Sequence, residues 1–301
     1  MISFQRSAIA AAGLAMLAMI PAQAKTFVLK TFDAPGATGT QVLGINNNGD
    51  MSGTWIDASS VSHGFFRTAA GVFTSIDFAG AVHTQCQDLN DSDHVVCSYR
   101  GTDGNVHAFL YQLGVFTPLP DFSTGAGNAT VSSPQGISAT SEITGFYTFD
   151  PAQVSGYHGF LMSNNNYAAT VNVPDPGNGV TTTNTYASAV NKPGVVGGYF
   201  TTSSGGVHGF TRATNGTYAQ VDFPFSQQSS VLGLNKSGHQ VGSFVDAKGV
   251  HGFYAAGSAF SRVNPPKSVS TWTASINDSD SIAGYYKDSS GKMHGFSGAP
   301  R

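Results

Sequence analysis

The sequence predicts an all-β protein, a six-bladed β-propeller with four antiparallel strands in each blade. The triplet His-Gly-Phe or His-Ala-Phe occurs six times at intervals of 43 to 51 residues, and such a period is typical of propellers and solenoids. Each repeat contains four short apolar runs between turn residues, without the 3.6-residue period of a helix. Only 10% of the residues are charged and 37 are Gly, which is unlike a protein of long, salt-bridged helices.

The first complete repeat shows the four strands, named A to D from the axis outward. We expect strand A at 41–45, strand B at 51–55, strand C at 63–67 and strand D at 72–78. Clusters of Asn, Asp, Ser and Gly separate them, and these residues favour tight turns. Strand A is rich in small residues such as Gly44 and Ala189, which suits the crowded innermost position.

The two ends of the chain predict that the ring closes on itself. Residues 26–35 read as a D strand with no A, B or C strand before it, and the chain ends after a C strand, HGFSG. We therefore expect the N-terminal segment to pair with the C-terminal blade and complete it.

Residues 1–24 have the pattern of a cleaved secretory signal peptide. Arg6 is followed by an apolar run, Ser7 to Ile20, and by a small-x-small site that ends at Ala24. The run is shorter than a membrane-spanning helix, and Lys25 rather than Cys follows the site. We predict a single propeller domain at 25–301, a secreted or periplasmic monomer without a membrane span.

The repeat resembles that of a known family. Its order of motifs is that of the HAF-repeat proteins, which are described as probable extracellular repeats: the chain is similar to them in GIN-x-x-G, then V-x-G-x-Y, then HGF or HAF. The Ala of the family's name occurs here once, at Ala108. The resemblance covers nearly all of residues 25–301. It implies export and a tandem array, and it implies no reaction and no catalytic residues.

Several partner and cofactor classes are disfavoured. The net charge is −3 and the 14 basic residues are scattered, so we expect no nucleic-acid partner. We also expect no cofactor, because the chain contains neither a phosphate-binding loop before a helix nor a CxxC pair. Segments 46–50, 88–93 and 277–280 resemble calcium loops but lack the bidentate Glu; hairpin turns need the same residue types. We expect no metal site.

The six triplet histidines fall on separate blades, about 60° apart around the axis, so they cannot converge on one ligand. We predict instead that each makes a hydrogen bond that locks its blade. Asp88 is different, because the equivalent positions on strand A are occupied by Gly, Ala or Ser. It is our candidate for a ligand group in the axial channel.

Three inserted loops break the repeat: 123–135, 148–157 and 174–186. All are D–A or B–C loops of neighbouring blades, which emerge on one face, as a binding rim would require. The alternative is that these surface loops differ in length without any effect on function. Their amide, hydroxyl and aromatic groups suit a neutral glycan. The candidate residues are Asn128, Thr130, Phe149, Asp150, Gln153, Tyr157, Asn178, Thr182, Asn184 and Tyr186.

Two functions follow from these features. The first is a non-catalytic, exported binding or surface-interaction module whose ligand is a glycan or another surface macromolecule. The alternative is a propeller enzyme, a hydrolase or lyase acting on extracellular polysaccharide. An enzyme needs converging acidic or cationic groups at the axis, whereas the sequence supplies Asp88 and little else.

The two cysteines predict a disulfide across one hairpin. An even-numbered A–B turn pairs Ile45 with Asp50, and in the next repeat Leu89 with His94. The same register places Cys86 opposite Cys97, close enough for a disulfide in an oxidising compartment. An odd turn would spoil the register, and two free buried thiols are the alternative.

Overall fold

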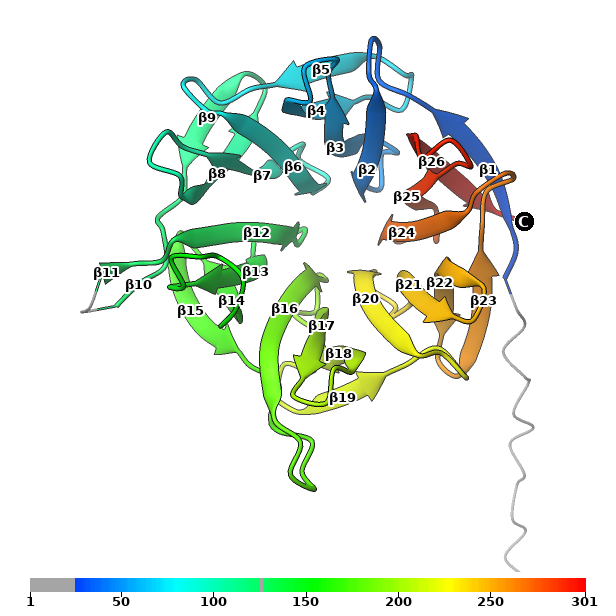
Figure 1. Ribbon diagram of the computed structural model, residues 1–301. Coiled ribbons are helices and arrows are strands. Elements are labelled where there is room, and N and C mark those ends of the chain that lie inside the picture. The colour runs from blue at the N-terminus through cyan, green and yellow to red at the C-terminus, as the bar shows by residue number, and fades with distance from the viewer. Residues whose placement is uncertain (1–24, 125–126) are drawn as a thin grey trace, which may run out of the picture.

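The computed structural model describes residues 25–124 and 127–301. Their strands form six blades arranged in a ring around a central channel (Figure 1), with strand A of each blade at the axis. The six-bladed propeller predicted from the repeats is confirmed. The predicted signal peptide, 1–24, lies outside the described residues. Within the described ranges, no helix is long and apolar enough to cross a membrane.

The first three blades contain the strands of residues 39–171. A parallel bridge between Val131 and Val106 joins blades 2 and 3 into one eight-stranded sheet. Blade 1 has β2 (Gly39–Ile45), β3 (Met51–Ile56), β4 (Ser62–Arg67) and β5 (Phe73–Ile76); blade 2 has β6 (His83–Leu89), β7 (Val95–Arg100), β8 (Val106–Gln112) and β9 (Val115–Pro118); blade 3 has β12 (Val131–Ile137), β13 (Ile143–Thr148), β14 (His158–Ser163) and β15 (Asn166–Val171).

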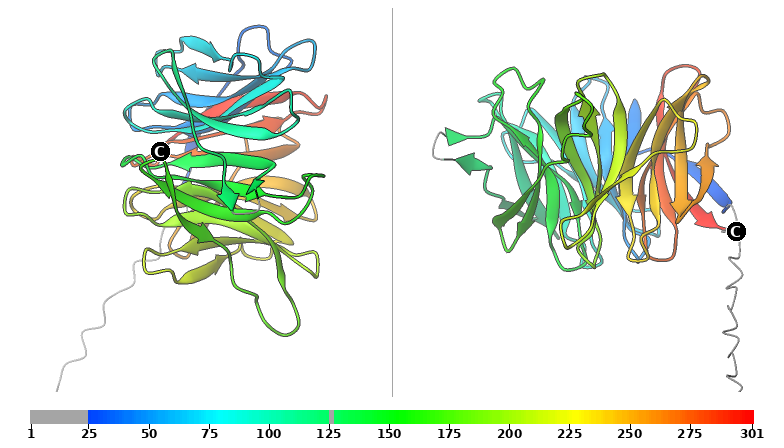
Figure 2. Two further views of the ribbon diagram at one scale, coloured as in Figure 1. Left: turned by 90° about the vertical axis from the view of Figure 1, so that its left-hand side faces the viewer. Right: turned by 90° about the horizontal axis from the view of Figure 1, so that it is seen from below.

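The last three blades complete the ring. The two-stranded hairpin β10 (Ser123–Thr124) and β11 (Gly127–Asn128) projects outward between blades 2 and 3 (Figures 1 and 2). Blade 4 has β16 (Thr182–Val190), β17 (Val196–Thr202), β18 (Val207–Arg212) and β19 (Tyr218–Val221); blade 5 has β20 (Gln228–Leu234), β21 (Gln240–Asp246), β22 (Gly249–Ala256) and β23 (Ala259–Val263); blade 6 has β24 (Ser270–Ile276), β25 (Ile282–Lys287), β26 (Met293–Pro300) and β1 (Phe27–Phe32).

Blade 6 is built from both ends of the chain. Strand β1 pairs antiparallel with β26, in a register that runs from Phe27 opposite Pro300 to Phe32 opposite Gly295. Phe27 and Leu29 also pack against a buried cluster that blades 5 and 6 share. The predicted closure is confirmed, and β26 would be an unpaired edge without β1.

Each triplet histidine bonds strand C to strand D. The Nδ1 of His63 lies 2.7 Å from a carboxylate oxygen of Asp77, and the ring stacks on Trp55 of strand B at 4.4 Å. The predicted blade-locking hydrogen bond is confirmed. The other five pairs are His107–Asp121, His158–Asn172, His208–Asp222, His251–Asn264 and His294–Asp33.

Asparagines of the A–B turns join neighbouring blades around the axis. In five of the six turns, the side-chain amide donates to a backbone carbonyl of the next blade, as Asn277 Nδ2 does to Asn46 at 3.0 Å. Blade 3 has Ser138 at this position, which lacks an amide donor. The other four bonds are Asn46 to Asn90, Asn90 to Ser138, Asn191 to Asn235 and Asn235 to Asn277.

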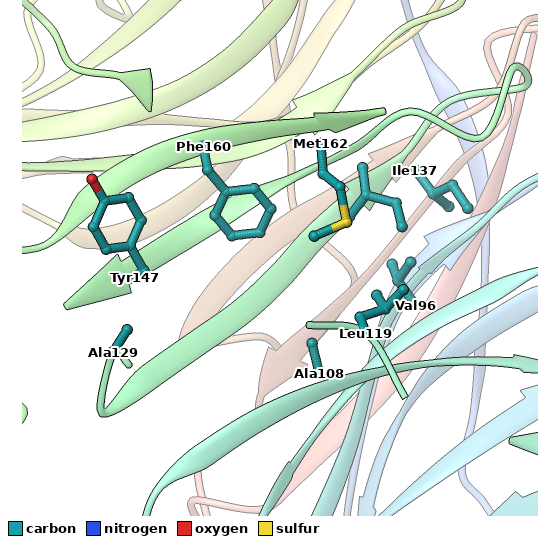
Figure 3. Close-up of a cluster of buried hydrophobic side chains, with 9 residues drawn as sticks. Val96, Ala108, Leu119, Ala129, Ile137, Tyr147, Phe160 and Met162 are labelled. Carbon is teal, nitrogen blue, oxygen red and sulfur yellow. The ribbon is translucent and has the colours of Figure 1, made fainter. Parts of the chain in front are cut away.

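Apolar side chains fill the spaces between blades. In the contact between blades 2 and 3, the triplet residue Phe160 is 1% exposed and packs with Ile137, Tyr147 and Met162 of its own blade (Figure 3). Val96, Ala108 and Leu119 of blade 2 belong to the same cluster. A propeller blade is stabilised in this way because a single sheet cannot bury both of its faces.

The register of the A–B hairpins differs from our expectation. Ile45 pairs with Met51 rather than Asp50, and Leu89 pairs with Val95 rather than His94. The turns are one residue longer than we expected, which shifts the pairing of the two strands by one residue. A β-bulge between Cys86 and Asp88 reverses this shift for the residues that precede it. Cys86 therefore still faces Cys97, and the predicted disulfide is confirmed.

Candidate functional site

A cavity of about 350 Å³ lies in the central channel. We call it the mouth cavity, because the starts of the A strands and the ends of the B strands line it, on the face of the D–A and B–C loops. It is within the range of small-ligand pockets, about 300–1,000 Å³. Its lining residues are Gln41, Leu43, Thr54, Gln85, Gln87, Ser133, Gln135, Phe146, Tyr186, Ser188, Tyr199, Leu232, Ala274 and Tyr285.

The floor of the mouth cavity is a ring of β-bulges. Every A strand has a bulge at the same position, and the extra residue of each one lines the cavity. Beyond this ring, toward the A–B turns, a second cavity has a volume of only about 80 Å³. The six bulge residues are Leu43, Gln87, Gln135, Ser188, Leu232 and Ala274.

Above the bulges, the six blades differ from one another. At this level one residue of strand A faces one of strand B, and two of the six pairs are stacked aromatics: Tyr186 on Tyr199 at 4.7 Å, and Trp272 on Tyr285 at 5.0 Å. The mouth is therefore asymmetric. The other pairs are Gln41–Thr54, Gln85–Ser98, Ser133–Phe146 and Ser230–Ser243.

The inserted loops of blades 3 and 4 extend the aromatic side of the mouth. Tyr157 and Tyr186 have ring centroids 5.2 Å apart, and Phe146 meets Tyr186 edge to face at 5.1 Å. The backbone N–H of Tyr157 donates to the side-chain oxygen of Asn184 at 3.0 Å. These contacts hold the two loops together beside the channel.

The lining of the mouth cavity contains no charged side chain among the described residues. Burial raises the pKa of Tyr199 and of Tyr285 to about 12, so both phenols stay protonated at ordinary pH and can donate hydrogen bonds. The Thr54 hydroxyl is buried without a hydrogen-bond partner among the described residues. The mouth therefore offers neutral donors and acceptors beside aromatic rings.

Asp88 lies below the bulges and lines the smaller cavity. Its Oδ2 accepts the backbone N–H of Ile137 from the next blade at 3.1 Å, as Ser275 accepts that of Ile45 at 3.2 Å. Burial raises the pKa of Asp88 to about 7, although the N–H groups of Ile137 and Leu89 oppose this shift. Its carboxyl group thus serves a contact between blades.

At this end of the channel, the side-chain amide of Asn47 forms hydrogen bonds with two further carboxylates. The Nδ2 of Asn47 donates to Asp91 at 2.8 Å and to Asp278 at 3.2 Å. Among the described residues, no group of three or more His, Cys, Asp or Glu is placed to hold a metal ion.

Most of the predicted rim residues interact within their own loops or with adjacent turns. Thr130 donates to the carbonyls of Thr148 and Asp150, and Thr182 donates to that of Pro174. The Asp150 carboxylate accepts bonds from the backbone N–H groups of Ala152, Val154 and Ser155 in its own loop.

Gln153 joins its loop to blade 2. It accepts a hydrogen bond from Arg100 and donates to the carbonyl of Gly104. Phe149 is 39% exposed and packs edge-on against Phe122.

The remaining rim candidates separate into two groups. Asn128 and Asn178 are exposed in segments that extend away from the ring (Figures 1 and 2). Tyr157, Asn184 and Tyr186 belong to the aromatic side of the mouth. The structure therefore brings three of the ten candidates together beside the channel.

Our sequence reasoning missed Phe146, Tyr199 and Tyr285. Each follows the Gly of strand B in the V-x-G-x-Y block, where blades 1, 2 and 5 have Thr54, Ser98 and Ser243. A comparison of the repeats at this position would have found them, because it varies within an otherwise regular pattern.

Comparisons with known proteins show the fold. A point mutant of the Aleuria aurantia lectin in complex with Fucα1-6GlcNAc is 11% identical, with a TM-score of 0.53 over 88% of this chain and 94% of that chain. A further structure, titled as a six-bladed β-propeller fungal lectin with a novel fucose recognition mode, is 12% identical, with a TM-score of 0.50 over 91% of both chains. AofleA from Arthrobotrys oligospora is 14% identical, with a TM-score of 0.50 over 91% of this chain and 83% of that chain.

No family model matches the chain, and no curated protein matches it. The resemblance to HAF-repeat proteins therefore stays a prediction. At 11–14% identity, the solved structures establish that this chain is similar in fold to six-bladed propeller lectins.

Proposed function

We propose that this protein is an exported, non-catalytic propeller that binds a neutral glycan at the mouth of its central channel. The observation that carries the proposal is the composition of the mouth cavity: four glutamine amides, Ser and Thr hydroxyls and four aromatic rings, with no charged side chain in the described lining. Ligand pockets are commonly apolar surfaces with a few fixed polar groups, and a sugar presents both an apolar face and several hydroxyls.

The acids of the channel favour a binding function over the polysaccharide-active alternative. Glycoside hydrolysis normally uses two carboxyl groups on either side of the scissile bond. Here Asp88 is bonded to the backbone of Ile137, and Asp91 and Asp278 are held by Asn47. All three belong to the smaller cavity, on the other side of the bulge ring from the mouth.

The likeness in fold to fucose-binding lectins is consistent with this proposal. The likeness in fold favours a binding protein, and the neutral polar and aromatic residues of the mouth favour a neutral sugar as its ligand. Export rests on the predicted signal peptide, and the Cys86–Cys97 disulfide agrees with an oxidising compartment.

A glycan array probed with labelled protein 25–301 tests the proposal. We expect binding to neutral glycans, and loss of that binding in Tyr199→Ala. Tyr199 is only partly buried at the mouth, where it stacks on Tyr186. This variant should therefore retain the far-UV circular dichroism and the cooperative thermal unfolding of the wild type. An array without neutral hits, or hits that Tyr199→Ala retains in full, would contradict the proposal.

A further inference from the structure

The variation among the six repeats is concentrated at the mouth. The His–Asp or His–Asn pair, the strand A bulge and the A–B turn recur around the ring with the same roles. The facing pairs at the mouth do not recur in this way, because two are aromatic on aromatic and the others combine Gln, Ser, Thr or Phe. A ligand site repeated in every blade needs repeated side chains, whereas this arrangement exists once.

Two glutamines and two tyrosines of the lining lie on different sides of the mouth. Gln85 and Gln87 come from blade 2, and their amides have no hydrogen-bond partner among the described residues. Tyr199 and Tyr285 come from blades 4 and 6, on either side of blade 5, which stands across the channel from blade 2 (Figure 1). Between the two tyrosines, blade 5 contributes only Leu232 to the lining.

The depth of the site is limited by the bulge ring. The mouth cavity has about 350 Å³, and the cavity beyond Leu43, Ser188 and Ala274 has about 80 Å³. The smallest pockets for small ligands have volumes of about 300 Å³. A sugar ring therefore fits above the bulges, and the bulges prevent it from going deeper. A glycan chain can then leave only through the opening by which it entered.

From these observations we infer that the mouth binds the terminal sugar of a neutral glycan end-on, with one glycan per molecule. Gln85 and Gln87 hydrogen-bond the hydroxyls of that sugar, and Tyr199 and Tyr285 contact its ring and donate from their phenols. This inference rests on the proposed function and specifies the end of the glycan and the number of sites. An anionic sugar is disfavoured because its charge would be desolvated without a partner in the lining.

Native mass spectrometry measures the number of sites. The probes are methyl glycosides of a neutral hexose, a 6-deoxyhexose and an N-acetylhexosamine, with a hexuronic acid as the charged control. We expect one equivalent of at least one neutral probe per molecule and no binding of the hexuronic acid. For the sugar that binds, a trisaccharide with it at the non-reducing end should bind, and an isomer with it in the middle should not.

Substitutions locate the site. Ser188→Trp fills the mouth at a bulge position and should abolish binding, whereas Ser59→Trp, on an exposed B–C turn of blade 1 on the same face, should leave it unchanged. Gln85→Leu and Gln87→Leu should each weaken binding about 10-fold, and Tyr285→Ala about 30-fold. Thermal unfolding and circular dichroism of each variant identify any that fail to fold.

The outcomes separate this inference from the proposed function. Several equivalents per molecule would overturn the single site and leave the proposed function standing. Binding that survives in folded Ser188→Trp would overturn the mouth as the site, and with it the location that the proposed function gives. Equal binding of terminal and internal sugars would overturn end-on recognition. Preference for the hexuronic acid would overturn the neutral specificity, and no binding of any probe or array glycan would overturn the proposed function itself.

Discussion

His294 and Asp33 are 261 residues apart in the sequence, yet the Nδ1 of His294 lies 3.0 Å from a carboxylate oxygen of Asp33. In the other blades the equivalent partners are 13 or 14 residues apart. The same strand C to strand D contact thus joins the two ends of the chain in blade 6 and stays within one repeat elsewhere.

Removal of β1 should destroy the ring. A chain that starts at Gly36 lacks both the partner strand of β26 and Asp33, and it exposes a strand edge. We expect loss of cooperative thermal unfolding and aggregation at concentrations where protein 25–301 is soluble. A truncated protein that melts at the same temperature as the longer one would contradict the closure.

The disulfide should be complete and stabilising. Alkylation of the unreduced protein should add no label to Cys86 or Cys97, and two labels in the mass spectrum would show free thiols. Cys86→Val combined with Cys97→Gly copies Val42 and Gly53 of blade 1, so it should fold. We expect it to lose roughly 2–3 kcal/mol of unfolding free energy, because a short closed loop is released.

Asp88 should make the protein less stable as the pH rises from about 4 to about 7. Its pKa is raised to about 7 by burial, so the folded state holds the proton more tightly than the unfolded chain, whose Asp pKa is about 3.9. Asp88→Asn keeps an acceptor for Ile137 without the charge. The melting temperature of the variant relative to wild type should increase between pH 5 and pH 8.

Asp288 provides the matched control with the opposite sign. A hydrogen bond from the Ser290 hydroxyl, followed by the contact with His294, lowers the pKa of Asp288 to about 2. The stability from this group is present above the unfolded-state pKa and is lost as the pH falls toward 2. Asp288→Asn should therefore destabilise the protein at neutral pH, and equal effects of the two variants would contradict both assignments.

The asparagine contacts between blades should be strengthened by one substitution and weakened by another. Ser138→Asn restores an amide donor at the junction of blades 3 and 4, and we expect a gain of about 1 kcal/mol. Asn191→Asp removes the donor that bonds the carbonyl of Asn235 at 2.9 Å and should cost about 1–3 kcal/mol. Urea unfolding measures both, and changes of the same sign would contradict this role.

Shortening the outer hairpin distinguishes the predicted loop rim from the mouth cavity. Replacing 123–128 by a two-residue turn removes Asn128 and leaves Tyr157 and Tyr186 in place. We expect the trimmed protein to keep its glycan affinity, since strands β10 and β11 extend away from the ring. A loss of affinity comparable to that of Tyr199→Ala would return the site to the loops.

The sequence was sufficient for the architecture because its signals are local and occur six times. The triplet histidines and the turn clusters gave the strands and the number of blades, and the incomplete repeats at Thr26 and Gly298 gave the closure. The Cys86–Cys97 pairing was also correct, although the register used to reach it was wrong at the turn. The bulge that corrected it follows from backbone hydrogen bonding, which no single residue type marks in this sequence.

The tertiary structure alone decided which side chains meet at the axis. Phe146, Tyr199 and Tyr285 belong to three repeats and are separated by more than 50 residues, so only the closed ring makes them lining residues of one cavity. Asp88 stood out in the sequence as a carboxyl group near the axis, but its partner, the Ile137 N–H, belongs to the next blade. Local pattern determines each blade, whereas the site depends on how neighbouring blades pack, because that packing sets which side chains of different repeats come within contact distance.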